Sequence, residues 1–286
     1  MTVLVFGANG QVGRELQRVG YVRALSREEA DVSKEADIVS AIEVMKPTAI
    51  VNAAAYTAVD KAETDSETAH LVNAIAPGIM AREARAREIP FVHISTDFVF
   101  DGAKTGPYTE DDAPAPKSVY GQTKLDGEKA VLEAGGNSVV LRTAWVFSPN
   151  GSNFVHIMIR LADERGILRV VEDQFGGPTS ARDIAVAALN IVRTRGATPG
   201  EVDIYHYAGG PDVSRVEFAR QIFRLSGRAP EILPIPTTDY PTPAERPLNS
   251  RLDCSKIEKD FEIERPDWRE SLARVLEEMG ELKANG

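Results

Sequence analysis

The 286-residue chain has one cysteine, four histidines and no long apolar run. Cys254 has no partner for an intramolecular disulfide, and the scattered histidines give no Cys/His metal-ligand spacing, so we expect no bound metal. No stretch of about 18 residues is free of charge, and no basic region precedes the apolar start, which favours neither a membrane span nor a signal peptide. These absences predict a cytoplasmic protein that does not act at a membrane.

The chain also has fewer basic than acidic residues. The chain carries 33 Lys and Arg against 43 Asp and Glu, for a formal net charge of -10. This balance argues against a protein that binds nucleic acid electrostatically. With 43% hydrophobic residues the chain should fold, and its length suits a large domain with a smaller lobe because such a chain buries roughly 75% of its extended surface.

Short, unbroken apolar runs alternate with stretches of helical length through the first half of the chain. Unbroken runs are typical of strands that are covered on both faces, and alternation with helices predicts βαβ units. We therefore predict an α/β fold, a doubly wound parallel sheet of the Rossmann type. The expected strands span 3–6, 49–52, 91–95 and 139–143, and the expected helices span 69–88, irregular at Pro77, and 120–133.

The pattern changes after Trp145, where proline and glycine become more frequent. Ser214 and Asp267 each stand three residues before a glutamate, which predicts two helix starts. The proline-dense segment 230–247 predicts an ordered loop over a binding cleft or a plain surface connection. We expect a coenzyme domain over 1–146 and about 180–207, and a smaller C-terminal substrate-binding lobe over about 147–179 and 208–286.

Glycines at 7, 10 and 13 follow the first predicted strand and open a helix, in the sequence GANGQVG. Such a turn lets the backbone approach a pyrophosphate, which then lies at the positive end of the helix. The spacing is G-x-x-G-x-x-G, and a purely structural turn is the alternative. The position at the very start of a βαβ pattern favours a dinucleotide.

A further strand is expected to end around residues 24–27, and its end selects the coenzyme. A carboxylate at this place accepts from the ribose 2′-hydroxyl of NAD, whereas a 2′-phosphate needs a cation instead. The chain has Ser26 and Arg27 there, followed by acidic residues that include Asp31. We predict NADPH as the cofactor, with NADH possible if Arg27 only pairs with a neighbouring carboxylate.

Tyr120 and Lys124 are four residues apart on a predicted helix and so share a face. A free phenol has a pKa of about 10, and an adjacent ammonium lowers it, which makes the pair suited to proton transfer. Thr96 follows the strand 91–95, whose carboxyl end borders the dinucleotide crevice of a doubly wound sheet. We expect Thr96 to donate a hydrogen bond to a substrate carbonyl while Tyr120 delivers a proton. We expect His93, on the same strand, to be a core residue and not a catalytic one.

Several segments carry a family resemblance: GANGQVG, STDFVFDG at 95–102, VYGQTKLDGEKA at 119–130, LRTAWVFSPNGSNF at 141–154, DQFGGPTSA at 173–181 and YPTPAERPLNSRLD at 240–253. They resemble the extended short-chain dehydrogenase/reductase superfamily and, within it, the dTDP-4-dehydrorhamnose reductase family. The resemblance implies reduction of the C4 ketone of dTDP-4-dehydro-6-deoxy-L-mannose by NADPH, the last step of dTDP-L-rhamnose synthesis. Tyr120 would be the proton donor, Lys124 its tuning and ribose-binding partner, and Thr96 the third member of the triad.

The resemblance also implies two sets of binding residues. The expected coenzyme-binding set, besides Tyr120 and Lys124, is Gly7, Asn9, Gly10, Gln11, Val12, Gly13, Ser26, Arg27, Asp31, Val32, Asn52, Ala53, Ala54, Ala55, Tyr56, Asn73 and Ser95. The expected set for the nucleotide sugar, a small-molecule partner, is Thr96, Asp97, Tyr120, Trp145, Asn153, Gln174, Arg246, Asn249 and Arg251.

The chain departs from the family pattern at two places. Phe98 stands where the family commonly has tyrosine, which removes a hydroxyl that could bind the sugar. Some members dimerise through a metal held by acidic side chains; Glu15 fits one such position, but Arg182 stands where a second carboxylate is expected. We therefore expect a monomer or a homodimer without a bridging metal.

Two other functions remain open at this point. One is another nucleotide-sugar reductase or epimerase of the same superfamily, which would need further acid/base residues in the lobe. The other is a non-catalytic regulatory subunit resembling that of methionine adenosyltransferase. A binding subunit has no need of Thr96, Tyr120 and Lys124 together, and their presence favours the enzyme.

Overall fold

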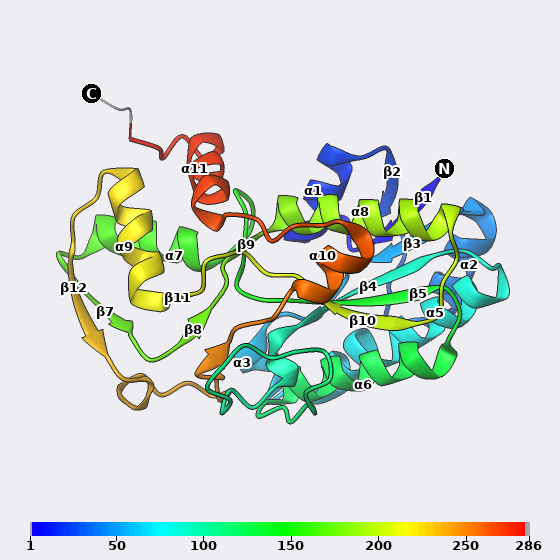
Figure 1. The fold of residues 1–286 in the computed structure, drawn as a ribbon, viewed down its shortest axis with the longest axis horizontal. Coiled ribbons are helices and arrows are strands. Elements are labelled where there is room, and N and C mark those ends of the chain that lie inside the picture. Colours follow the sequence, from blue (N-terminus) through cyan, green and yellow to red (C-terminus); the bar gives the residue numbers. More distant parts are fainter. Residues whose placement is uncertain (1, 284–286) are drawn as a thin grey trace.

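The computed structural model describes residues 2–283 and is organised around a six-stranded parallel sheet. The strand order is β10-β5-β4-β3-β1-β2. Strand β2 is added on one side of β1 and the later strands on the other, so the switch point lies between β1 and β3, which is where a doubly wound sheet binds its ligand. The predicted fold class is confirmed (Figure 1). The strands are β1 (Val3–Phe6), β2 (Val22–Leu25), β3 (Ala49–Asn52), β4 (Phe91–Thr96), β5 (Ser138–Thr143) and β10 (Asp203–His206).

Helices cover both faces of this sheet, and β1 shows why its sequence is apolar throughout. Val3 and Val5 point into one core with α1 and α8, whereas Leu4 and Phe6 point into a second core with α2 and α5. With both faces buried, no position on the strand is left for a polar residue. The helices are α1 (Gln11–Val19), α8 (Ala181–Ala197), α2 (Glu35–Met45), α5 (Ala76–Ala86) and α6 (Val119–Ala134).

The helical stretch expected over 69–88 is interrupted, but before Pro77 and not at it. It consists of α4 (Ser66–His70), a π-helical turn η1 (Leu71–Ile75) and α5, with Pro77 in the first turn of α5, where its missing N–H costs nothing. Single π turns occur frequently at functional sites. This one places the buried Asn73 against the loop that follows β3.

The smaller lobe lies beside the sheet (Figure 1) and has its own core around Phe147, Phe218 and Trp268. The expected helix starts at Ser214, with a capping box, and at Asp267 are confirmed. The lobe elements are α7 (Phe154–Glu164), β7 (Ile167–Val171), α9 (Arg215–Ser226), β12 (Glu231–Ile235), the 3-10 turn η3 (Thr237–Asp239) and α11 (Trp268–Glu278).

β12 corrects one sequence expectation, because residues 231–235 were expected in a loop. β12 pairs only with β7, in a two-stranded parallel sheet. Pro234 is tolerated because a strand with one partner leaves half of its backbone groups outside the ladder. The remainder of the proline-dense segment is irregular apart from η3, and β13 (Asn249–Ser250) follows it. β13 pairs with β8 (Phe175–Gly176), which also pairs with β11 (Val213–Ser214), while β6 (Val146–Phe147) pairs with β9 (Thr179–Ser180).

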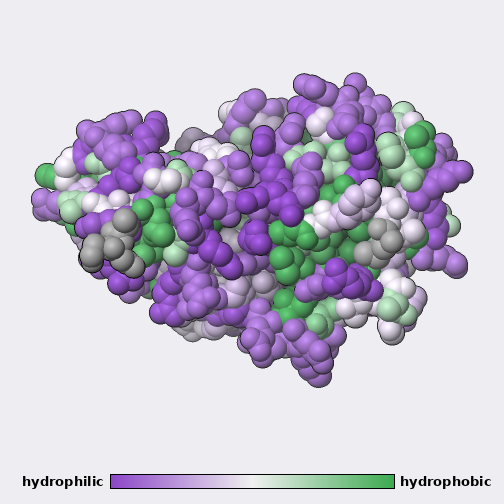
Figure 2. All heavy atoms as spheres, turned by 90° about the horizontal axis from the view of Figure 1, so that it is seen from above, coloured by the Kyte–Doolittle hydropathy of each residue, from purple (hydrophilic) through white to green (hydrophobic). Residues whose placement is uncertain are grey.

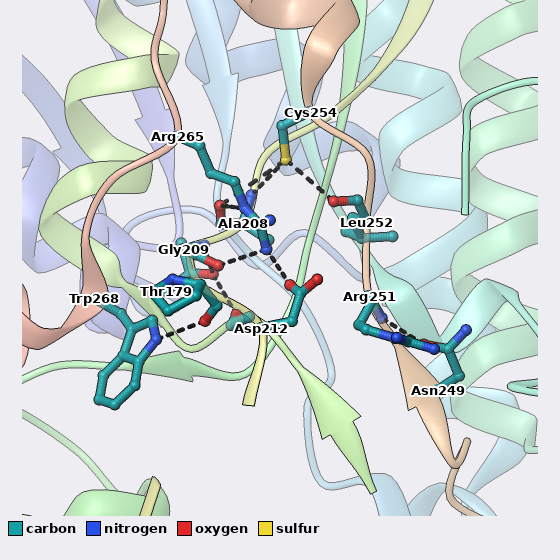
Figure 3. Close-up of polar contacts among 12 residues, drawn as sticks. Thr179, Ala208, Gly209, Asp212, Asn249, Arg251, Leu252, Cys254, Arg265 and Trp268 are labelled. Carbon is teal, nitrogen blue, oxygen red and sulfur yellow. Dashed lines mark hydrogen bonds and ion pairs between the residues drawn. The ribbon is translucent and has the colours of Figure 1, made fainter. Parts of the chain in front are cut away.

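Arg265 and Cys254 mark the junction between lobe and sheet (Figure 3). Arg265 donates from Nε to the Ala208 carbonyl at 3.0 Å and pairs with Asp212, while the buried Cys254 Sγ accepts from the Ala208 N–H at 3.3 Å. Leu252, Cys254, Ile257 and Ile263 pack in the core of the large sheet, although residues 208–286 were expected in the lobe. The chain therefore returns to the coenzyme domain through α10 (Ser255–Phe261) before it enters α11.

The face of the molecule that Figure 2 shows is mainly hydrophilic. Its apolar residues gather on the half that holds the six-stranded sheet. Val186 of α8 is among the partly exposed apolar residues. Within residues 2–283, no helix combines the length and the apolarity that crossing a bilayer requires.

Candidate active site

The glycine loop between β1 and α1 packs directly on the end of β3. Gly7 has φ +96°, and a Cβ added there would lie 2.6 Å from the Ala54 nitrogen. A Cβ added at Gly13 would lie 2.0 Å from the Gly7 carbonyl oxygen. Any larger residue at either position would push the two segments apart, so these glycines allow the close backbone approach that a pyrophosphate site needs.

The N-terminus of α1 opens onto this loop without a side-chain cap. Gly10 is exposed at the N-cap position, so the first N–H groups of the helix are free to bind an anion. Gln11 Oε1 accepts from Ser148 Oγ at 2.9 Å and from Asn153 Nδ2 at 3.0 Å. One expected coenzyme residue and one expected sugar residue thus touch, and Asn153 also caps α7. Val12 is buried beneath the loop, and Asn9 is exposed.

At the end of β2, the two residues expected to select the coenzyme lie among acidic neighbours. The Arg27 side chain is 75% exposed and pairs with Asp31 at 3.5 Å. Ser26 donates its N–H to Glu29 Oε2 at 2.9 Å, and Glu29 also pairs with Arg23. Two arginines are therefore available at this end of the loop, each held by one carboxylate. Val32 is half-buried beside Asp31.

The segment after β3 is fixed by two asparagines. Asn52 Oδ1 accepts from the Ala54 N–H at 3.0 Å, and Asn73 Oδ1 accepts from the Tyr56 N–H at 2.8 Å. Asn73 Nδ2 also donates to Thr123 Oγ1 of α6 at 3.1 Å. The expected coenzyme residues Ala53, Ala54, Ala55 and Tyr56 therefore form one half-buried strip between the glycine loop and α6.

Thr96 and Tyr120 meet at the carboxyl end of β4. Thr96 lies close enough to the Tyr120 phenol to affect its pKa, and the Thr96 oxygen accepts from the Phe98 N–H at 3.2 Å. The Tyr120 ring is buried edge-on against Phe98, with ring centroids 5.5 Å apart. The apolar ring of Phe98 thus takes part in positioning the phenol, although it offers no hydroxyl to a ligand.

The expectation that Lys124 lowers the Tyr120 pKa is wrong for the coenzyme-free chain. Burial raises the pKa of Tyr120 to about 12, Thr96 opposes this rise, and the nearby Asp97 adds to it. Lys124 does not counteract the rise because its Nζ donates to the Ile94 carbonyl at 2.7 Å and lies 3.1 Å from His93 Nε2. Burial lowers the pKa of Lys124 to about 8, and Glu128 partly offsets this.

Asp97 lies next to the pair in a buried position. Its Oδ1 accepts from Thr96 Oγ1 at 3.0 Å, while Oδ2 is buried without a partner. Burial raises the pKa of Asp97 to about 6, against the opposing effects of Ser250, Thr96 and Arg215. Arg215 in turn lies 3.5 Å above the centre of the Trp145 ring. Asp97, Arg215 and Trp145 thus form a continuous layer from Thr96 and Tyr120 to the lobe.

Ser95 has a structural partner. Its hydroxyl donates to the buried Glu128 of α6, which forms a bidentate ion pair with the buried Arg142 of β5 at 2.7 Å. Because all three groups are inaccessible to water, the bond set fixes α6 against β4 and β5. The Ser95 side chain acts here by holding the helix that carries Tyr120 and Lys124.

Four more of the residues expected at the nucleotide sugar make contacts within the protein. Arg246 pairs with Asp60 of α3 (Val59–Ala62) at 2.8 Å, and Gln174 Nε2 donates to Thr237 Oγ1 at 3.2 Å. Arg251 donates to Asn249 Oδ1 at 2.8 Å, and both side chains appear together in Figure 3. Arg246 and Asn249 lie on the segment that leads from the lobe back to the sheet, and Gln174 lies between β7 and β8.

Glu15 and Arg182 line the same small cavity, between α1, α8 and α11. Glu15 is buried, with Oε1 accepting from Arg18 at 2.9 Å and Oε2 without a partner. Arg274 and Glu278 also face this cavity. Across residues 2–283, no group of three or more His, Cys, Asp or Glu side chains has a metal-binding arrangement.

Three residues at the site were not assigned to it from the sequence. His93 is a buried core residue as expected, yet it contacts Lys124, while Arg215 stacks on Trp145 and Asp60 binds Arg246. Each contact joins residues at least 31 positions apart, so no local pattern reveals it. The signal for His93 was its place on β4, three residues before Thr96 at the strand end.

A parallel sheet with a glycine loop at its switch point, next to a threonine, a tyrosine and a lysine, defines a nicotinamide-dependent oxidoreductase of the short-chain dehydrogenase type. The family model for the RmlD substrate binding domain matches residues 1–281. The chain belongs to this family.

Relatives of known name agree along the whole chain. A dTDP-4-dehydrorhamnose reductase from Burkholderia thailandensis is 43% identical over 295 residues, which cover 98% of this chain and 99% of that protein. A crystal structure of dTDP-4-dehydrorhamnose reductase from Bacillus anthracis in complex with NADP superposes with a TM-score of 0.91 at 32% identity, covering 97% of this chain and 99% of that one. A Clostridium acetobutylicum structure of the same name has a TM-score of 0.92 at 35% identity, with 98% and 100% covered.

Proposed function

We propose that the chain reduces the C4 ketone of dTDP-4-dehydro-6-deoxy-L-mannose to dTDP-L-rhamnose with NADPH, in the cytoplasm. The observation that carries this proposal is that the buried side chains of Thr96 and Tyr120 meet at the end of β4, beside Lys124 and across the switch point from the glycine loop. The names of the relatives supply the substrate. We also propose that the sheet and the lobe, as expected from the sequence, are the coenzyme and substrate domains.

The residues at the switch point fit a dinucleotide. Gly7 and Gly13 leave the room that a Cβ would fill, and Gly10 exposes the start of α1 to a pyrophosphate. Arg27 would pair with a 2′-phosphate in place of Asp31. When bound, NADPH supplies the hydride for the ketone carbon.

Tyr120 acts as the acid. With a pKa of about 12 its phenol is fully protonated at neutral pH, so it carries a proton to give to the oxygen that becomes an alkoxide. Thr96 lies beside the phenol at the end of β4, and its hydroxyl, which donates to Asp97 Oδ1 at 3.0 Å, would turn to donate to the same oxygen. Lys124 would bind the nicotinamide ribose, and once the coenzyme draws its Nζ toward Tyr120 its charge would stabilise the phenolate that proton transfer leaves behind.

The remaining polar side chains would hold the nucleotide sugar. Trp145 presents a flat face backed by Arg215, and Asn153 is tied to the glycine loop through Gln11. Arg246 carries a positive charge that a diphosphate would draw away from Asp60. Gln174, Asn249 and Arg251 lie on the neighbouring segments and would complete this set.

The Tyr120→Phe variant tests the activity. It keeps the ring against Phe98 and removes only the hydroxyl, so we expect kcat for NADPH oxidation with the ketosugar to fall by about 100-fold or more while NADPH still binds. Tyr240→Phe, at an exposed tyrosine, should leave kcat unchanged. Unaltered turnover by Tyr120→Phe would refute the role of the phenol. A wild-type chain that binds NADPH but does not oxidise it would support the regulatory-subunit alternative.

A further inference from the structure

A continuous line of polar contacts connects the loop after β3 to Lys124. The Ala54 N–H donates to Asn52 Oδ1 at 3.0 Å, Asn52 Nδ2 lies 3.1 Å from His93 Nδ1, and His93 Nε2 lies 3.1 Å from Lys124 Nζ. Asn52, His93 and Lys124 are each at most 1% exposed. No water reaches these groups, so every polar atom in the line depends on its neighbour.

The hydrogen-bond donors and acceptors along this line of polar contacts can be assigned. Because Asn52 Oδ1 accepts from Ala54, its amide NH2 faces His93 Nδ1, which must therefore act as an acceptor. Burial and Lys124 both lower the pKa of His93 far below its usual value, so the ring is neutral and carries its one proton on Nε2. That N–H points at Lys124 Nζ, and only an uncharged amine has a lone pair to accept it.

A second arrangement satisfies a charged Lys124. The ammonium then donates to His93 Nε2, and the ring carries its proton on Nδ1. A proton there would oppose the Asn52 NH2, so the amide must turn its oxygen toward His93. The turned amide no longer accepts from the Ala54 N–H, which becomes free on the side of Gly7.

We infer that His93 is a positioning residue that couples the coenzyme loop to the charge of Lys124. When Lys124 takes up one proton, His93 releases its proton from Nε2 and binds one at Nδ1 without a change of ring charge, and Asn52 turns its amide away from Ala54. A ligand that accepts from the Ala54 N–H favours the turned amide and, through it, the charged lysine.

The other charged groups around Lys124 either are paired with an opposite charge or act mainly on Tyr120. Glu128, one turn along α6, favours the ammonium but is itself paired with Arg142 of β5. Tyr120 shares the helix with Lys124, and Asp97, which follows β4, acts on the Tyr120 phenol. The pKa of Lys124, about 8, places its loss of charge within reach of ordinary buffers.

The test is the tautomer of His93, read from two-bond proton–nitrogen NMR correlations of the full-length, coenzyme-free chain labelled with [15N]histidine. We expect the ring proton to move from Nδ1 to Nε2 between about pH 7 and about pH 9.5, with a midpoint near the Lys124 pKa of about 8. A tautomer that stays the same over this range overturns the inference. Of the four histidines, the His93 signals are those lost in His93→Gln.

His206 is a control within the same chain. Its Nδ1 donates to the Tyr108 carbonyl at 3.1 Å, and its Nε2 faces the Arg142 guanidinium at 3.3 Å. Arginine stays charged at every accessible pH, so His206 should keep its proton on Nδ1 throughout. In Lys124→Met the His93 titration should disappear, and a titration that persists would show that another group drives it.

The coupling also has a kinetic consequence, which rests on the proposed function. His93→Gln replaces the ring N–H with an amide that can accept from the ammonium, so the upper pKa in the kcat/KM profile for NADPH should rise by about one unit. A purely structural role would lower kcat/KM equally at every pH and leave that pKa in place. A fixed His93 tautomer would refute the coupling and leave the reductase standing, whereas a titrating tautomer without turnover would refute the reductase alone.

Discussion

At the scale of single residues, burial sets the chemistry of the site more than pairing does. Tyr120 keeps its proton because its ring is enclosed, and Lys124 loses affinity for its proton for the same reason. The two shifts move the pKa values of Tyr120 and Lys124 further apart. The phenol holds its proton at every ordinary pH, whereas the charge of the lysine changes close to neutral pH.

Asp97 offers a direct measurement of this burial. Its pKa in the folded chain, about 6, lies above the ordinary value of 3.8, so the acid form stabilises the fold below about pH 4, and that stabilisation is lost as pH rises through 6. The Asp97→Asn variant should therefore be more stable than wild type at pH 7, by about 3 kcal/mol, and similar to it near pH 4. Urea unfolding at both pH values measures the difference.

Glu28→Gln is the matched control, since Glu28 is exposed. It should change the difference between the two pH values by less than about 0.5 kcal/mol. An Asp97→Asn variant that loses stability at pH 7 would show that the carboxylate is held by partners stronger than Thr96 and Arg215.

The sequence predicted the pairing of Tyr120 with Lys124 but not the direction of the lysine side chain. Spacing along a helix determines which residues share a face, and this was sufficient to identify the two groups. The contact of Lys124 with His93 depends on how α6 lies across β4, and that arrangement is a property of the packed sheet. The same holds for Arg215 on Trp145.

At the scale of elements, the sheet was predictable because both of its faces are buried. Unbroken apolar runs identified β1 and β3 within their observed bounds, and β4 to within one residue. The π turn η1 and the strand β12 were not predictable. The first depends on Asn73 reaching both Tyr56 and Thr123, and the second on a partner strand about sixty residues earlier.

Gly7 and Gly13, which flank the turn from β1 into α1, should not tolerate a side chain. In Gly13→Ala the new Cβ would collide with the Gly7 carbonyl, so we expect a loss of about 1–3 kcal/mol in stability and at least about tenfold weaker NADPH binding. Calorimetric titration with NADPH and urea unfolding measure the two effects.

Gly166→Ala is the control for that substitution, because an added Cβ there meets nothing within 4 Å. It should bind NADPH as the wild type does. Equal affinity of the two variants would mean that the loop adjusts freely and does not form a rigid cradle.

At the scale of the whole molecule, an acidic protein is proposed to bind two polyanions. The net charge of -10 cannot attract them, so binding depends on local groups such as the helix start behind Gly10, Arg27 and Arg246. Each of these arginines is paired with a carboxylate in the ligand-free chain. Ligand binding therefore exchanges one ion pair for another, and specificity comes from the geometry of the exchange.

Arg27→Ala tests this exchange. It removes the cation proposed for the 2′-phosphate, so the ratio of kcat/KM for NADPH to that for NADH should fall by about tenfold. Arg228→Ala, in the lobe and paired with Asp163, should leave the ratio unchanged. A wild-type enzyme that uses NADH as well as NADPH would contradict the assignment of the coenzyme.

Cys254 provides the molecule with a natural reporter. As the only thiol in the chain, buried where the lobe joins the sheet, it can be alkylated only when that junction opens. The rate at which a thiol reagent modifies Cys254 therefore measures how often the lobe and the sheet separate. Any ligand that bridges the lobe and the sheet should lower this rate in proportion to the fraction of time that it holds them together.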